Sequence, residues 1–318
     1  MWWTCDRGVP VPLTSETMCV ISRAAARYAE DMTSSTRWTL GAPVPLTSGA
    51  GVDVRPNWTP DSQQVFFERL EDGVRRLYRI AADGTGLTAL EACNQPDSNA
   101  TGRVAFFGPD DFAFVSDRSG QPALWRCDLC QGTVQALLQA DAPCHGPSLA
   151  LNGAWPLLYF QQIDEHTAHV SRLDPDGRPT QLTLAPGLQD QPWPLSDGRR
   201  FVYHAQDHDC NTVYIQDLTP GSAPVSLSAE DEGTAYVTPY PSPDGAWIAF
   251  SSARTGRSQV WVMRLDGSDR QQVTTGAPHS FPAWSPNGRH LVVVRGEPTA
   301  DQPSGHLWVI EMLPGSSV

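Results

Sequence analysis

Six polar or charged side chains that could bind a ligand are distributed along the chain. They are Arg55, Arg103, His145, Asp190, Gln191 and His279. Arginine forms paired hydrogen bonds with carboxylates, and histidine, aspartate and glutamine supply further donors and acceptors. This set suits an anionic or polar ligand, provided that the fold brings the six positions together. The alternative is that each is a separate, solvated loop residue.

Three histidines are weaker candidates for metal ligands: His204, His208 and His279. His204 and His208 stand four residues apart in FVYHAQDHDC, a spacing that places two side chains on one face only in a helix. Here the two residues fall at a strand end and in the loop after it, so the spacing provides no metal geometry. A solvated loop is therefore the favoured interpretation.

The chain contains seven cysteines without a spaced disulfide framework, which indicates mostly reduced thiols. Cys127 and Cys130, followed by Cys144 and His145, could form a zinc knuckle, because thiolate and imidazole are ligands that zinc prefers. A strong zinc signal needs a second pair of this kind. The segments LDPDGRP and LDGSDR lack the bidentate glutamate of a calcium loop and predict hairpin turns instead. We expect no cofactor, with manganese, zinc or calcium as weaker alternatives.

A repeated unit must position these residues. In YPSPDGAWIAFSSARTGRSQVWVMRLDGSDRQQVTTG, residues 240–276, SPDG suits a type I turn and the runs after it predict a four-stranded meander. A spacing of roughly forty-odd residues is typical of one β-propeller blade. The equivalent turn residues, spaced by 49, 42, 45, 47 and 43 positions, are Asp61, Asp110, Asn152, Asp197, Asp244 and Asn287.

In a propeller, the innermost strand of each blade lines the axial channel. Aligned on their turns, the six candidate side chains fall just before the inner strands, or one position further out for His279. We therefore expect them to converge from different blades on one channel mouth. The two arginines would be the anchors for an anion there, or would be paired with a nearby carboxylate such as Asp53 or Asp190.

The repeats NWTPD, PSPDG and AWSPNG, with the downstream runs LYRIAADGTGLTAL and VWVMRLDGSDRQQVTTG, resemble the TolB-like family of β-propellers over about 270 residues. The resemblance implies the propeller fold but no single activity, because such propellers serve as gating domains, sugar lyases and scaffolds. FVYHAQDHDC is also similar to the histidine-bearing segment of oligogalacturonate lyases, in which several histidines and a glutamine hold Mn²⁺. That resemblance implies His204 as a ligand, but the glutamine and two close histidines that should complete the set are missing.

The predicted fold class is all-β: one domain over residues 1–318, forming a seven-bladed propeller of four-stranded antiparallel blades. PVPLTS occurs at residues 10–15 and 43–48, and the first blade would run between these copies. WWTCD at the N-terminus would then complete the last blade and close the ring. In the six-blade alternative, the second PVPLTS closes the ring and about 40 residues form an N-terminal extension.

Composition limits the partners. The net charge of −13 disfavours nucleic acid and anionic membranes, and the absence of lysine excludes Schiff-base chemistry by a lysine side chain. No apolar run is long enough to span a membrane, and the N-terminal residues lack the pattern of a secretory signal. The sequence as written predicts a cytoplasmic monomer, or a periplasmic or secreted protein if a signal peptide has been removed.

Two functions from different classes follow. The preferred hypothesis is a non-catalytic scaffold that binds a protein or an oligosaccharide at the channel mouth and loops, since neither Gly-x-Ser-x-Gly nor His-Glu-x-x-His occurs. The alternative is a metal-dependent oligosaccharide lyase or hydrolase that acts at the same mouth.

Overall fold

A computed structural model describes residues 38–315, apart from 152, 155, 208–209, 229–235 and 297–303. Residues Thr39–Leu313 form one compact unit. All regular elements among its described residues are β-strands, and none of the described residues forms a helix long and apolar enough to cross a membrane. The prediction of an all-β protein is confirmed.

The strands are grouped as consecutive antiparallel meanders, which we call blades and name by their strands. The first three blades are β3 (Val52–Trp58), β4 (Gln64–Glu71), β5 (Val74–Ala81) and β6 (Thr88–Ala89); β7 (Ala100–Gly108), β8 (Asp111–Ser116), β9 (Ala123–Asp128) and β10 (Thr133–Leu138); and β11 (Cys144–Ser148), β12 (Leu157–Gln162), β13 (Ala168–Leu173) and β14 (Pro179–Gln181).

The remaining chain repeats this order. The next two blades are β15 (Leu188–Pro194), β16 (Arg200–Asp207), β17 (Cys210–Asp217) and β18 (Val225–Ser226); and β19 (Val237–Pro241), β20 (Trp247–Ser252), β21 (Gln259–Arg264) and β22 (Gln271–Gln272). The last sheet consists of β23 (His279–Trp284), β24 (His290–Arg295) and β25 (His306–Pro314), with β1 (Trp38–Leu40) and β2 (Val44–Pro45) paired to β25.

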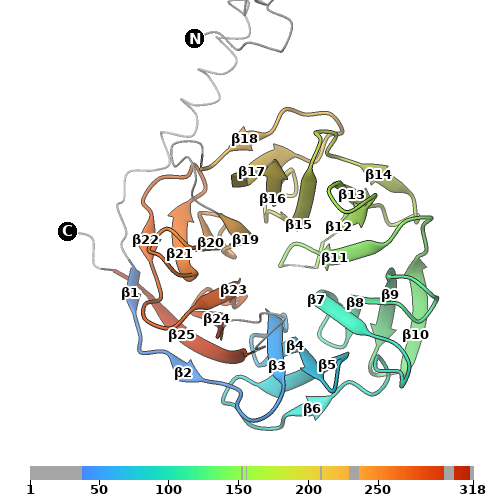
Figure 1. Cartoon of the computed structure of the whole chain (residues 1–318), viewed down its shortest axis with the longest axis horizontal. Helices are drawn as coiled ribbons and strands as arrows, with labels where there is room; N and C mark the ends of the chain where they lie inside the picture. Colours follow the sequence, from blue (N-terminus) through green and yellow to red (C-terminus); the bar gives the residue numbers. More distant parts are fainter. Residues whose placement is uncertain are drawn as a thin grey trace, which may run out of the picture. The chain divides into compact units, whose positions relative to one another are not determined.

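The blades are arranged radially as a β-propeller, with β3, β7, β11, β15, β19 and β23 innermost (Figure 1). Each inner strand contacts the inner strand of the next blade, and β23 contacts β3, so these strands form a closed ring. A single parallel pair, Ala168 with Leu188, joins blades β11–β14 and β15–β18 into one eight-stranded sheet. Closure leaves short outer edges, which limits unwanted strand pairing.

β1 and β2 both pair with the outer side of β25 in the last blade, and β2 does so through Val44 with Val309 and Pro45 with Trp308. Thr47 extends this contact, because its Oγ1 accepts a hydrogen bond of 2.8 Å from the Leu307 N–H. The second PVPLTS segment thus occupies the place that the six-blade alternative predicts. The seven-blade count is not confirmed, and WWTCD, predicted to fill that place, lies outside the described residues.

The turn between the first two strands of a blade forms as the SPDG pattern predicts. The Ser242 Oγ donates to the Asp244 carboxylate, which also accepts from the Ala246 N–H at 3.0 Å. Gly245 takes the left-handed conformation, φ +69°, that glycine adopts without steric cost. Thr59 with Asp61 and Ser285 with Asn287 make the same hydroxyl contact in other blades.

Apolar side chains of adjacent blades pack face to face. Phe66 of β4 meets Phe106 of β7 and Phe112 of β8, with ring centroids 5.1 and 5.4 Å apart and the rings nearly perpendicular. All three side chains are buried. These edge-to-face contacts hold blades β3–β6 and β7–β10 together.

Candidate functional site

A β-bulge interrupts each of the six inner strands at an equivalent place. The register with the second strand of the blade shifts there, and one residue takes a positive φ between 49° and 81°. Bulges redirect side chains and often lie beside binding sites. The positive-φ residues are Arg55, Gly102, Gly146, Gln191, Thr238 and Phe281.

The candidate side chains lie in or beside these bulges, within the inner strands. The sequence analysis placed them just before the strands; this was wrong because each inner strand begins further upstream, as β3 does at Val52. The bulge hides this start from a search for simple alternation, since the side-chain period of two is broken there.

A cavity of about 370 Å³ lies at the inner strands of four neighbouring blades, β3–β6 through β15–β18. Five of the six predicted residues line it: Arg55, Arg103, His145, Asp190 and Gln191. His279 is not among its lining residues. That histidine is buried on β23 with no hydrogen-bond partner for Nδ1 in the described part of the chain, and burial lowers its pKa.

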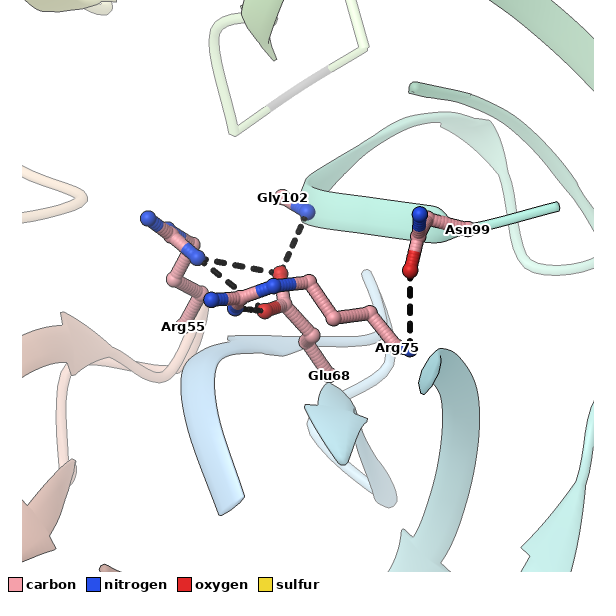
Figure 2. Close-up of polar contacts among 5 residues, drawn as sticks. All are labelled: Arg55, Glu68, Arg75, Asn99 and Gly102. Atoms are coloured by element: carbon pink, nitrogen blue, oxygen red, sulfur yellow. Dashed lines mark hydrogen bonds and ion pairs between the residues drawn. The ribbon is translucent and has the colours of Figure 1, made fainter. Parts of the chain in front are cut away.

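Two arginines on the cavity wall share one buried carboxylate (Figure 2). The Nη1 atom of Arg55 lies 3.1 Å from both carboxylate oxygens of Glu68, whose side chain is fully buried. The Nη1 atom of Arg75 donates to the same carboxylate, and the Gly102 N–H donates to it over 2.8 Å. The Asn99 side chain accepts from the Arg75 N–H at 3.0 Å. Glu68 therefore fixes both guanidinium groups.

This arrangement corrects the expectation that a nearby aspartate pairs with Arg55. Asp53 instead binds Arg69 in a buried bidentate pair, with distances of 2.6 and 3.0 Å. Simple alternation would place Asp53 and Arg55 on one face of the strand, but the bulge at Arg55 breaks this alternation. Pairing of Arg55 with a carboxylate was anticipated, but its partner, Glu68, was not.

Arg103 is different, because no described carboxylate forms an ion pair with it. Its side chain is 6 % exposed; Nη2 donates to the Pro282 carbonyl at 3.0 Å, and the buried Nη1 has no hydrogen-bond partner among the described atoms. The guanidinium lies 5.6 Å from the Trp193 ring and 5.2 Å from the Tyr240 ring. The pKa of Arg103 is lowered to about 10, chiefly by burial; Tyr240 opposes this shift and the charge of Arg55 adds to it.

The bulge of β7 differs from the other five in a way that places Arg103. Proline follows the positive-φ residue in the other inner strands, whereas Arg103 follows Gly102. The register shift on β7 runs from Thr101 to Ala105 and is one residue longer than in the others. Arg103 thus follows the positive-φ residue at the place where each of the other inner strands carries a proline. The prolines are Pro56, Pro147, Pro192, Pro239 and Pro282.

His145 and Asp190 lie at the cavity wall in different settings. The His145 ring stacks on Phe160, with centroids 5.4 Å apart, and burial together with Arg55 lowers its pKa. Asp190 Oδ1 lies 2.7 Å from Nδ1 of the buried His204. The His204 Nε2 lies 2.8 Å from Asn211 Oδ1, so both ring nitrogens face acceptors. Burial opposes the charged ring, but the contacts with Asp190 and Asn211 together outweigh it and raise the pKa of His204.

His204 is therefore held by hydrogen bonds to protein, and the second candidate metal ligand, His208, lies outside the described residues. Within the described ranges, no group of three or more histidine, cysteine, aspartate and glutamate side chains is placed to hold a metal ion. Cys127 and Cys144 are buried free thiols, whereas Cys130 is an exposed one. A zinc knuckle at these cysteines is thus not found.

Three residues of the site were missed in the sequence: Glu68, Arg75 and Asn99. A signal for Glu68 does exist, because a charged residue in the apolar strand QVFFERLE must be paired if it is buried. Arg75 follows a hairpin turn and carries no comparable signal. Its role depends on the approach of β5 to β7, which only the ring arrangement shows.

The fold and this cavity define a β-propeller protein, and comparisons with known proteins agree. No protein-family model matches the chain. An uncharacterized protein, Atu1656, from Agrobacterium fabrum is 36 % identical over 101 residues, which cover 31 % of this chain and 33 % of that protein. The chain thus matches only about a third of the length of this curated relative.

Solved structures of TolB share the fold. TolB from Acinetobacter baumannii has a TM-score of 0.65 at 15 % identity, covering 86 % of this chain and 74 % of that one. A putative TolB from Agrobacterium tumefaciens has a TM-score of 0.63 at 17 % identity, covering 88 % and 99 %. Oligogalacturonate lyase from Vibrio parahaemolyticus has a TM-score of 0.56 at 12 % identity, covering 89 % and 98 %. The predicted resemblance to TolB-like propellers is confirmed for the fold.

Proposed function

We propose that this chain is a non-catalytic, ligand-binding β-propeller whose binding surface is the cavity at the bulged inner strands. The partner would be a protein or an oligosaccharide. The observation that carries the proposal is the convergence of Arg55, Arg103, His145, Asp190 and Gln191 on this one cavity. A site built from side chains of several blades can contact an extended ligand at several points.

The hydrogen bonding of the acidic groups favours binding over acid–base catalysis. Glu68 is bound by two arginines, and Asp190 is bound by His204. Asp117 accepts hydrogen bonds from the backbone and side chain of Asn99, 2.7 and 2.8 Å away. A general acid or base must exchange a proton with the substrate, whereas these carboxylates are each fixed by protein donors.

A cavity-filling substitution tests the site. Thr101 lines the cavity and is half-buried, so Thr101→Trp should block it and abolish binding of acidic peptides and oligosaccharides in a ligand screen by NMR. Thr133→Trp, on the exposed outer strand β10, is the matched control and should bind like the unmodified protein. Equal binding by both variants would refute the cavity as the binding surface. One equivalent of bound manganese or zinc in the purified protein would instead support the lyase alternative.

We further propose six blades, with the ring closed by β2. The pairing of Val44 with Val309 and the contact between β23 and β3 support this count. Removal of residues 1–37 should then leave the melting temperature unchanged, whereas removal of residues 1–48 should lower it by several degrees, because the outer edge of β25 would lose its partner. A large loss already in the shorter truncation would favour seven blades.

A further inference from the structure

We propose that the cavity contains a subsite for a single carboxylate group, formed by Arg55, Arg75 and Arg103. The inference rests on the proposed binding function and names the chemistry of the ligand. It is carried by two features of the described residues: hydrogen-bond donors that the protein leaves unused, and a local excess of positive charge.

The first two arginines each use a single terminal nitrogen within the protein. Nη1 of Arg55 and Nη1 of Arg75 both bind Glu68, and the other guanidinium nitrogens of these side chains make no hydrogen bond among the described residues. Both side chains are about 40 % exposed, at 40 % and 41 %, and both line the cavity. Figure 2 shows the two guanidinium groups converging on Glu68 from different strands. Because Glu68 already positions these guanidinium groups, their remaining N–H donors can bind an anion with little further loss of side-chain entropy.

Arg103 adds a buried guanidinium to the same cavity. A buried polar group without a partner is rare in proteins, and its presence calls for a water, ion or ligand. One hydrogen bond, from Nη2 to the Pro282 carbonyl, holds the guanidinium, and Nη1 has no hydrogen-bond partner among the described residues. The rings of Trp193 and Tyr240 beside it stabilise the cation without neutralising it.

The charges at the cavity favour a monoanion. Three arginines and two aspartates, Asp117 and Asp190, line the cavity, so its lining carries one more positive than negative charge. Glu68 is not a lining residue, and its side chain is fully buried. This excess occurs in a chain whose net charge is −13. A carboxylate would match it, whereas a phosphate dianion would also meet the repulsion of Asp117 and Asp190. Val115, Phe160 and Trp193 on the wall suit an apolar body attached to the carboxylate.

The test compares acids with their neutral counterparts on the full chain. The probes are a hexuronic acid trisaccharide with its neutral hexose trisaccharide, a tripeptide acid with its C-terminal amide, and inorganic phosphate. Binding is measured by NMR and isothermal titration calorimetry at low ionic strength, since salt screens exposed charges. We expect at least one acid to bind about tenfold more tightly than its neutral form, the difference that one charge-assisted contact provides. Which pair responds identifies a sugar or a peptide as the source of the carboxylate.

Three variants assign the contacts. Arg55→Met, Arg75→Met and Arg103→Met should each lower the affinity for the acid by about tenfold and leave that for the neutral form unchanged. Arg178→Met is the matched control, because Arg178 is 84 % exposed in a hairpin away from the cavity. The melting temperature of each variant shows whether it is folded. If the Arg103 variant does not fold, the Arg75 variant still tests the subsite, because the Arg75 side chain is partly exposed.

The outcomes separate the two proposals. Equal affinity for acid and neutral forms, both lost in Thr101→Trp, would overturn the carboxylate subsite and keep the cavity as the binding surface. Preferential binding of phosphate would also overturn it. Acid binding that persists in Thr101→Trp would refute both the cavity and the subsite.

Discussion

The Glu68 carboxylate on β4 accepts a hydrogen bond of 2.8 Å from the Gly102 N–H on β7, and so links two blades. The same carboxylate is the shared partner of Arg55 and Arg75. Because its side chain is fully buried, each lost donor would leave a charge without solvation. Glu68 thus couples the packing of blades β3–β6 and β7–β10 to the placement of the two cavity arginines.

Substitution Glu68→Ala should destabilise the fold. The variant removes the acceptor of three donors and leaves two arginines unpaired. Because these arginines are partly exposed, we expect a loss of about 2 kcal/mol in the free energy of unfolding. Urea denaturation measures it, with Glu165→Ala, at a 92 % exposed loop position, as the control with an effect below about 0.5 kcal/mol. A similar effect of both variants would contradict the structural role of Glu68.

The pair of Asp53 and Arg69 should be more sensitive, because both side chains are buried. Asp53→Ala leaves the Arg69 guanidinium without its bidentate partner, and breaking a buried pair from one side costs about 3–5 kcal/mol. The double variant Asp53→Leu, Arg69→Met should recover most of this loss, since no charge remains buried. Thermal and urea unfolding of both variants provide the comparison. A double variant as unstable as the single one would show that the charge is not the cause.

Much of the fold was predictable because its signals are local. The turn at Ser242 and Asp244 depends on four adjacent residues, and its recurrence fixes the length of a blade. Ring closure depends on the pairing of Val44 with Val309, residues far apart in the sequence. Two short PVPLTS segments gave no physical basis for choosing which one fills that edge, so the preferred count of seven was not confirmed.

The candidate site was predictable in part. Counting from the turns brought His145, Asp190 and Gln191 to one cavity, because the bulge recurs at nearly the same distance from each turn. Counting back from the turns makes Arg103 equivalent to His145. The bulge of β7 contains one more residue than that of β11, so the two side chains do not occupy equivalent positions. The ion-pair partner of Arg55 could not be predicted by counting residues. It depends on the direction in which each side chain points after the bulge in its strand.

The contact between His204 and Asp190 predicts a pH dependence of stability. The folded pKa of His204 is raised, since the Asp190 and Asn211 hydrogen bonds outweigh the effect of burial. The stabilisation is therefore complete below the unfolded pKa of about 6.5 and is lost as the pH rises through the folded pKa. The unfolding free energy of the unmodified protein minus that of His204→Gln should fall as the pH rises above about 6.5. A difference that rises with pH would show that His204 is buried in its neutral form.

Arg103 should carry a cost in stability. Its Nη1 is buried without a partner in the described structure, and desolvation lowers its pKa to about 10. Methionine fills a similar volume without a charge, and an unsatisfied buried polar group costs about 1–3 kcal/mol. Arg103→Met should therefore stabilise the free protein by about 1 kcal/mol and raise its melting temperature by about 2 °C.

The control for this prediction is Arg69→Met, which removes an equally buried arginine that has a carboxylate partner and should be destabilising. Differential scanning calorimetry without ligand compares the two variants with the unmodified protein. If Arg103→Met is destabilised as strongly as Arg69→Met, the Arg103 guanidinium already has its hydrogen-bond partners within the folded chain. It is then not available to bind a ligand. Stabilisation together with weaker binding of the acid probe would show that the ring interior retains this arginine for binding, at the expense of stability.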